Sequence, residues 1–115
     1  MALPWIPLEQ ENQLDEIRTK SNESPCIIFK HSTRCSISTV ALQRLDNTAE
    51  PSTKASYYYL DLIKFRAISN KIAEVFQIHH ESPQVLVITK GKCCYEETHL
   101  GIEADELQQQ IGNHL

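Results

Sequence analysis

Two short apolar runs limit the fold of this 115-residue chain more than any other feature. They occupy residues 26–29 (CIIF) and 85–88 (VLVI), and neither exceeds four residues. A continuous run of this length, rich in β-branched residues, is typical of a buried strand. It is far below the roughly 20 residues that a membrane-spanning helix needs. We therefore expect strands that form a sheet with helices on both faces.

Helical and strand-like segments alternate along the chain. Apolar residues recur at helical spacing in four segments: residues 8–22, 35–46, 65–76 and 107–111. Strands are predicted at residues 26–30, 57–62, 84–89 and 93–96, the last two joined by a hairpin turn at Gly91. A right-handed crossover makes the first two strands parallel. This order predicts one domain over residues 1–115, an α/β thioredoxin-like fold with a four-stranded mixed sheet and an extra N-terminal helix.

Charge and the N-terminus narrow the setting in which the protein works. The chain has 11 Lys and Arg against 15 Asp and Glu, a net charge of −4, and no two basic residues are adjacent. A nucleic-acid partner is therefore not expected. No Lys or Arg precedes Arg18, so the basic start of a signal peptide is missing. We expect a cytoplasmic protein that has no membrane partner and acts as a monomer.

The four cysteines contain no Cys-x-x-Cys pair, which argues against a disulfide framework or a structural zinc site. Cys26 opens a buried strand and is expected to be structural. Cys93 and Cys94 are neighbours in a predicted strand, so their side chains are expected to point to opposite faces. One of these two could still act as a distant resolving thiol for Cys35.

Cys35 lies where the first strand's polar turn gives way to a helix. The first N–H groups of a helix have no partners and carry partial positive charge. Together with Arg34 and His31, they are expected to stabilise the thiolate, which is the reactive form of cysteine. The alternative is that Cys35 is only a small apolar residue of the core.

Ser38 completes a Cys-x-x-Ser motif with Cys35. A dithiol oxidoreductase carries its resolving thiol at this position, and serine cannot replace it. The Ser38 hydroxyl is instead expected to donate a hydrogen bond to the Cys35 sulfur. A mixed disulfide on Cys35 would then wait for an external thiol.

Pro83 directly precedes the third predicted strand. In a thioredoxin-like sheet this position holds a cis-proline that faces the nucleophilic cysteine, and a cis bond before proline costs only about 0.5–1 kcal/mol. We therefore expect a cis Ser82–Pro83 bond that exposes the backbone of Ser82 to a substrate chain. His79 and His80, close by, are not expected to bind a metal, because neighbouring side chains of an extended segment diverge.

Residues 29–38 (FKHSTRCSIS) closely resemble the active-site stretch of the monothiol bacilliredoxin family, also called bacillithiol-system YtxJ proteins. The resemblance spans about residues 26–111, and its most specific block is residues 80–84 (HESPQ). Other shared positions are Tyr59, Leu60, Asp61, Leu62, Arg66, Ser69, Asn70, Val85, Leu86, Gly91, Lys92 and His99. The family usually has proline after the active cysteine. Here Ser36 stands there, which is expected to loosen the start of the helix.

The resemblance implies an oxidoreductase that removes a low-molecular-weight thiol, such as bacillithiol, from S-thiolated proteins. It implies Cys35 as the nucleophile with Ser38 beside it, and no metal or cofactor apart from the exchanging thiol. The expected substrate-binding residues are Arg34, Ser36, Ile37, Ser82 and Pro83, with support from His31, His80 and His99. Two alternatives remain: an iron–sulfur carrier like monothiol glutaredoxins, and a non-catalytic thioredoxin-like adaptor.

Overall fold

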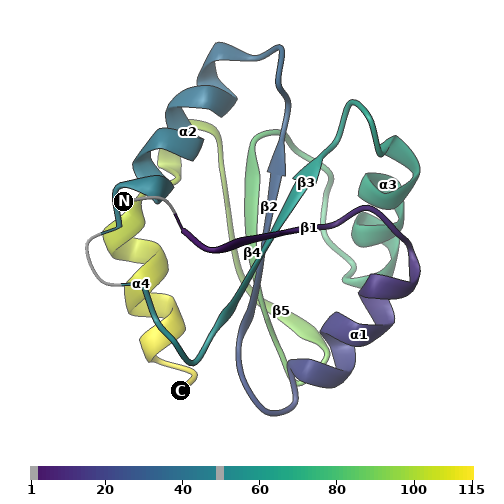
Figure 1. Ribbon diagram of the computed structural model, residues 1–115, viewed down its shortest axis with the longest axis vertical. Coiled ribbons are helices and arrows are strands. Elements are labelled where there is room, and N and C mark those ends of the chain that lie inside the picture. Colours follow the sequence, from purple (N-terminus) through teal and green to yellow (C-terminus); the bar gives the residue numbers. More distant parts are fainter. Residues whose placement is uncertain (1–2, 49–50) are drawn as a thin grey trace.

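Strands and helices alternate along the computed structural model, which describes residues 3–48 and 51–115. In chain order the elements are β1 (Trp5–Pro7), α1 (Asn12–Lys20), β2 (Cys26–His31), α2 (Ser36–Asp46), β3 (Ser56–Asp61), α3 (Arg66–Val75), β4 (Gln84–Thr89), β5 (Lys92–Thr98) and α4 (Ala104–Gly112). A short 3-10 helix, η1 (His99–Gly101), separates β5 from α4. The predicted alternation of helices and strands is confirmed from α1 to α4 (Figure 1).

The strands form one mixed sheet in the order β1-β3-β2-β4-β5. β1 and β2 both pair with β3 in parallel, whereas β4 is antiparallel to β2 and to β5. Because β2 lies at the centre, all six of its residues are buried. Its final two residues, Lys30 and His31, are polar, and they introduce buried polar chemistry at the end of the strand that leads to Cys35.

The sheet has five strands rather than the four that the sequence predicts, because a short strand precedes α1. β1 has only three residues and ends in Pro7, and proline is tolerated at such an edge because no neighbour needs its missing N–H. Trp5 anchors the strand by donating from Nε1 to Asp46 Oδ1 over 2.7 Å. The predicted N-terminal helix starts later than expected, at Asn12, and is preceded by this strand.

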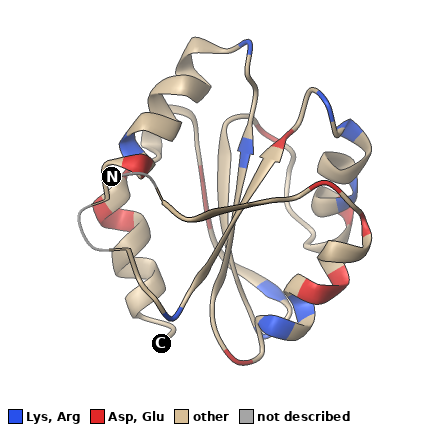
Figure 2. Cartoon of the chain, in the orientation of Figure 1, with Lys and Arg blue, Asp and Glu red and all other residues tan. Residues whose placement is uncertain are grey.

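Helices cover both faces of the sheet, with α1 and α3 on one side and α2 and α4 on the other (Figure 1). The core therefore has two layers. On the α1–α3 side, Ile17, Ile28 and Ile72 are fully buried. On the α2–α4 side, Phe29 and Leu45 are fully buried. Charged residues are scattered along α1 and α3, while the first two turns of α2 contain none (Figure 2).

The hairpin between β4 and β5 turns through Lys90 and Gly91, whose φ angles are 53° and 76°. Two successive residues with positive φ are typical of the type I′ turn that suits a hairpin, as predicted. The ladder above the turn contains a bulge, because Val87 pairs with Tyr95 but Ile88 pairs with Cys93. Cys94 is the extra residue of this bulge.

The bulge interrupts the regular alternation of side chains near Cys93 and Cys94, of which Cys93 packs against the core and Cys94 is exposed. In a regular strand Cys93 and Tyr95 would share a face. Here Cys93 packs against the α1–α3 side and Tyr95 against the α2–α4 side. The strict alternation of side chains therefore breaks somewhere between Cys93 and Tyr95.

Among the described residues, no helix is both long enough and apolar enough to cross a membrane.

Candidate active site around Cys35

Cys35 is the N-cap residue of α2, at the exit of the turn that follows β2. Its backbone is extended, with φ −112° and ψ 122°, and its N–H donates to the carbonyl of Ser32 over 3.1 Å. Its own carbonyl accepts the amide of Thr39, the first bond of the helix. The thiol is partly exposed. The predicted helix start is thereby confirmed, and the partial positive charge of the first turn lies beside the sulfur.

The residues flanking Cys35 are open to solvent. Arg34, Ser36 and Ile37 are all exposed, and Ile37 keeps 39% of its surface accessible. An apolar side chain with this exposure next to a thiol can contact a partner protein. Their predicted role in substrate binding is compatible with this exposure and stays a prediction.

Ser38 is fully buried and does not make its predicted hydrogen bond to the Cys35 sulfur. Its hydroxyl oxygen accepts the Ser32 N–H over 3.0 Å and lies 2.6 Å from His31 Nδ1. The Ser32 amide donates to the hydroxyl oxygen, so the hydroxyl hydrogen stays available for His31. The contact with His31 is one hydrogen bond, in which either the hydroxyl donates to Nδ1 or Nδ1–H donates to the hydroxyl. The serine therefore ties the first turn of α2 to the end of β2. This fixes the direction in which Cys35 leaves the sheet.

His31 is almost completely buried at the end of β2. Its ring stacks on Phe29 with centroids 5.8 Å apart and contacts Tyr59 at 5.6 Å. Burial lowers the pKa of His31, and the nearby charge of Asp61 and the contact with Ser38 offset part of this effect. The lowered pKa favours a neutral ring, which can hold Ser38 through Nδ1 at neutral pH.

Lys30 projects from β2 to the opposite side of the sheet, where it is fully buried and makes no ion pair with a carboxylate of residues 3–48 or 51–115. Its ammonium lies 3.0 Å from His80 Nδ1, and the buried Ser69 hydroxyl is 3.4 Å from the same nitrogen. Burial lowers the pKa of Lys30 to about 8. The pKa of His80 is also lowered, by burial first and then by the charges of Lys30 and Arg66. His80 was among the residues predicted to support the site, whereas Lys30 was not, although a lysine at the end of an apolar strand is a signal in the sequence.

Ser82–Pro83 is a cis peptide, as predicted. Lys30 and Gln84 are paired in the ladder, so Pro83 lies one step beyond that pair, at the level of His31. The carbonyl of Pro83 accepts the N–H of His99 over 3.0 Å, which holds the proline against the end of β5. The Ser82 hydroxyl is buried and has no hydrogen-bond partner among the described residues. An unpaired buried hydroxyl is unfavourable, so it costs stability in the proline loop.

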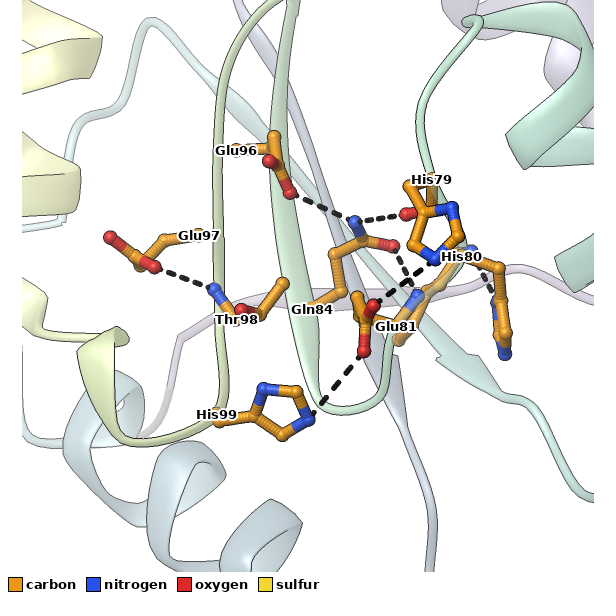
Figure 3. Close-up of polar contacts among 9 residues, drawn as sticks. His79, His80, Glu81, Gln84, Glu96, Glu97, Thr98 and His99 are labelled. Atoms are coloured by element: carbon orange, nitrogen blue, oxygen red, sulfur yellow. Dashed lines mark hydrogen bonds and ion pairs between the residues drawn. The ribbon is translucent and has the colours of Figure 1, made fainter.

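The segment before Pro83 is tied to β5 by polar contacts (Figure 3). Gln84 is fully buried and donates from Nε2 to the His79 carbonyl and to Glu96. Glu81 lies between two imidazoles, 3.4 Å from His79 Nε2 and 3.8 Å from His99 Nε2. These contacts hold the strand-entry loop in place. They also show that His99 supports the proline loop through its backbone and Glu81.

The predicted site residues form two separate contacts on opposite sides of the sheet. The end of β2, the start of α2 and the proline loop bring together His31 and Ser38, and separately Lys30 and His80. The other cysteines are elsewhere, because Cys26 pairs with Ile88 and Ile88 with Cys93 at the far end of the sheet. A strand rises about 3.3 Å per residue, so β2 puts roughly 17 Å between the two ends. A disulfide needs Cα atoms about 4.4–6.8 Å apart, and an internal partner for Cys35 is therefore excluded in this fold.

No group of three or more His, Cys, Asp or Glu side chains is arranged to hold a metal ion within residues 3–48 and 51–115.

Comparison with known proteins agrees with the resemblance of the sequence. The profile of the family described as monothiol bacilliredoxin BrxC matches residues 6–107. Among solved structures, a thioredoxin-fold protein with a proposed oxidoreductase activity is 26% identical, with a TM-score of 0.78 and 91% of each chain covered. Thioredoxin f from spinach chloroplast is 14% identical, with a TM-score of 0.71 and coverage of 96% of this chain and 92% of that one. A thioredoxin from Nicotiana alata is 16% identical, with a TM-score of 0.73 and coverage of 99% and 95%. The thioredoxin-like fold is confirmed.

Proposed function

The chain belongs to the monothiol bacilliredoxin BrxC family, and from this premise we propose that it removes a low-molecular-weight thiol such as bacillithiol from S-thiolated proteins. In the proposed reaction the Cys35 thiolate attacks the small thiol's sulfur in the mixed disulfide. The old S–S bond breaks, and the protein sulfur leaves as a thiolate that takes a proton from solvent. The small thiol remains on Cys35 as a new mixed disulfide.

A second molecule of the small thiol completes the proposed cycle. Its thiolate attacks the small-thiol sulfur bound to Cys35, forms the symmetrical small-thiol disulfide and releases the Cys35 thiolate. In the net reaction one free small thiol is consumed, its sulfur joins the one removed from the substrate in a disulfide, and the substrate protein regains its thiol. The proposed setting is the reducing cytoplasm.

The observation that carries this proposal is the isolation of Cys35 from the other three thiols. Cys26, Cys93 and Cys94 lie at the opposite end of the sheet, and Ser38 is held by His31 and Ser32. A mixed disulfide on Cys35 has no internal thiol within reach, so only an external thiol can release it. This suits exchange with a small thiol rather than reduction of protein disulfides.

The proline loop supports the same proposal from the substrate side. A substrate chain that pairs with the backbone of Ser82 would lie beside the end of β2, near the start of α2. The exposed Ile37 would contact the same partner.

Intact-mass measurement on both proteins tests the proposal. A substrate whose single cysteine carries bacillithiol is incubated with wild-type protein, and the adduct mass should leave the substrate and appear on Cys35. Cys35→Ser should show no transfer, with a rate at least about 10³-fold lower. Cys94→Ser, which removes an exposed thiol far from the site, should transfer like wild type. Equal transfer by Cys35→Ser would overturn the proposal, and a wild type that binds the substrate without any adduct would favour a non-catalytic adaptor.

A further inference from the structure

The contact between Lys30 and His80 determines which nitrogen of the imidazole carries its hydrogen. The Lys30 ammonium lies 3.0 Å from Nδ1, and an ammonium can only donate, so Nδ1 accepts and the hydrogen of the neutral ring lies on Nε2. The buried Ser69 hydroxyl also meets the ring at Nδ1. Because His80 is only partly buried, its Nε2–H is a hydrogen-bond donor that remains available to a ligand.

This pair of residues lies at the same end of the sheet as Cys35. The parallel strands β2 and β3 end at the paired residues His31 and Asp61. From there α2 runs over one face of the sheet and α3 over the other (Figure 1). Helices that diverge in this way from neighbouring parallel strands mark the place where α/β sheets bind ligands. A small molecule bonded to Cys35 therefore lies where α3 also begins.

The start of α3 adds positive charge beside His80. Its first turn contains no acidic residue and has no side-chain cap, so its free N–H groups carry partial positive charge. Arg66 is the first residue of the helix and is exposed. The pKa of His80 is lowered by burial first and then by the charges of Lys30 and Arg66, which shows that both cations act on the ring.

The carboxylates at this end of the sheet are engaged elsewhere. Glu81 lies between His79 and His99, at 3.4 and 3.8 Å. Asp61 accepts the amides of residues 63–64 through Oδ1. Lys30 is fully buried and makes no ion pair with a carboxylate of residues 3–48 or 51–115. An anion bound against the exposed part of this cluster would therefore supply the opposing charge that a buried cation lacks.

We propose that His80, Arg66 and the start of α3 form a subsite for a carboxylate of the small thiol that Cys35 exchanges. Lys30 is a positioning residue that holds the His80 ring in its donor form. The inference rests on the proposed function and names its substrate class, a small thiol that carries an acid group. Nε2–H and the guanidinium donate to the carboxylate, and the helix start stabilises its charge.

Exchange with two simple disulfides of different charge tests the subsite. Reduced full-length protein is mixed with dithiodipropionate, which is anionic, or with hydroxyethyl disulfide, which is neutral, and intact mass follows the adduct on Cys35. The ratio of the anionic to the neutral rate should fall about tenfold in Arg66→Met, as for the loss of one charge-assisted hydrogen bond. Lys30→Met should lower the ratio as well. The matched control is Lys71→Met, which removes the same charge further along α3 and should keep the wild-type ratio.

A second measurement does not depend on the thiol of Cys35. In Cys35→Ser, titration with succinate should move the NMR signals of the His80 ring to a saturating shift, and adding Arg66→Met should weaken this binding about tenfold. Unmoved His80 signals, or a rate ratio in Arg66→Met equal to that of wild type, would overturn the subsite even if dethiolation occurs. If neither disulfide leaves an adduct on Cys35, the proposed function fails, and the succinate titration still decides the subsite.

Discussion

The two ends of the sheet surround cysteine with different structure, and so they suit different chemistry. At one end Cys35 is a helix N-cap, alone among thiols, with its neighbours exposed. At the other end Cys93 and Cys94 share a bulge in an edge strand, and burial raises the pKa of Cys93. The first arrangement favours a nucleophile that waits for an external thiol. The second favours a thiol that stays protonated at neutral pH, because burial raises the pKa of Cys93 to about 11.

Backbone geometry produces this difference, since the residue type is the same. Cys35 lies at a helix start, where the first turn carries partial positive charge. The Cys93 and Cys94 sulfurs instead each meet a backbone carbonyl, that of Tyr95 and that of Val87 respectively. An N–H stabilises a thiolate, and a carbonyl accepts a hydrogen from a thiol. The comparison can be tested by making one end resemble the other.

Ser38→Cys has the largest expected effect, because it gives the Cys35 end a second thiol. The new sulfur would stand one helical turn from Cys35 and should close an internal disulfide that releases any adduct. The lifetime of the bacillithiol adduct on Cys35 should fall by about a hundredfold, as expected for an internal thiol at high effective concentration. Intact mass against time measures it.

The matched control is Ser36→Cys, which adds a thiol on the same helix at the position next to Cys35. Its adduct should persist as in wild type. If wild type reduces protein disulfides as fast as Ser38→Cys, the monothiol interpretation of the Cys35 end is wrong.

Most of the fold followed from the sequence because its strands are short and apolar while its helices are periodic. The helix start at Cys35 and the cis bond at Pro83 were both predicted correctly. β1 was missed since three residues ending in proline give no periodic signal, and pairing with β3 alone makes them a strand. The bulge was missed for a related reason. A one-residue register shift depends on the partner strand and leaves no local pattern.

The candidate site was harder to predict where it depends on buried polar contacts. Ser38 was expected to serve Cys35, but β2 places His31 close enough to take its hydroxyl. In the sequence Lys30 is only the polar last residue of an apolar strand, and its partner His80 is 50 residues away. Such contacts between distant segments follow from the register of the sheet, which one sequence does not reveal.

Lys30→Met should stabilise the protein, with the second-largest expected effect. A pKa lowered from 10.5 to about 8 corresponds to about 3 kcal/mol against burying the charged amine. Losing the contact with His80 costs about 1 kcal/mol. The free energy of unfolding at pH 7 should therefore rise by about 2 kcal/mol, as measured by urea denaturation. A decrease in the free energy of unfolding would show that other interactions of the Lys30 ammonium outweigh the cost of burying its charge.

The pH dependence sharpens this test, because β2 carries groups of opposite behaviour at its two ends. The folded pKa of Lys30 is below its unfolded value. Burial of Lys30 therefore costs no stability above about pH 10.5, where the amine is neutral in both states, and the full cost is reached as pH falls through about 8. The pKa of Cys26 is raised to about 11, so its contribution is lost as pH rises from 9 through 11. Wild-type stability should rise between pH 8 and 10.5, and this rise should be absent in Lys30→Met. Wild-type stability should fall between pH 9 and 11, and this fall should be absent in Cys26→Ala.

His31→Gln has the smallest expected effect and tests whether the imidazole holds the Cys35 end in place. Burial lowers the pKa of His31 below 6.5, so the unfolded chain takes up the proton first as pH falls. The stability contributed by the neutral ring is present above about pH 6.5 and is lost as pH falls through the lowered pKa. Glutamine can still hydrogen bond to Ser38, so the variant should lose only about 1 kcal/mol at pH 7.5. Between pH 7 and 5 its stability should fall less than that of wild type.

The matched control for this last test is His99→Gln, whose ring is half exposed and which meets Glu81 instead of a buried serine. That variant removes an imidazole without touching the contact between His31 and Ser38, so its free energy of unfolding at pH 7.5 should stay within about 0.5 kcal/mol of wild type. An unchanged pH dependence in His31→Gln would show that His31 does not titrate on unfolding. The tie between β2 and the first turn of α2 would then rest on the Ser32 amide alone. In that case the bacillithiol transfer rate of His31→Gln should equal that of wild type, whereas a ring that positions Cys35 through Ser38 predicts a slower transfer with an unchanged adduct mass.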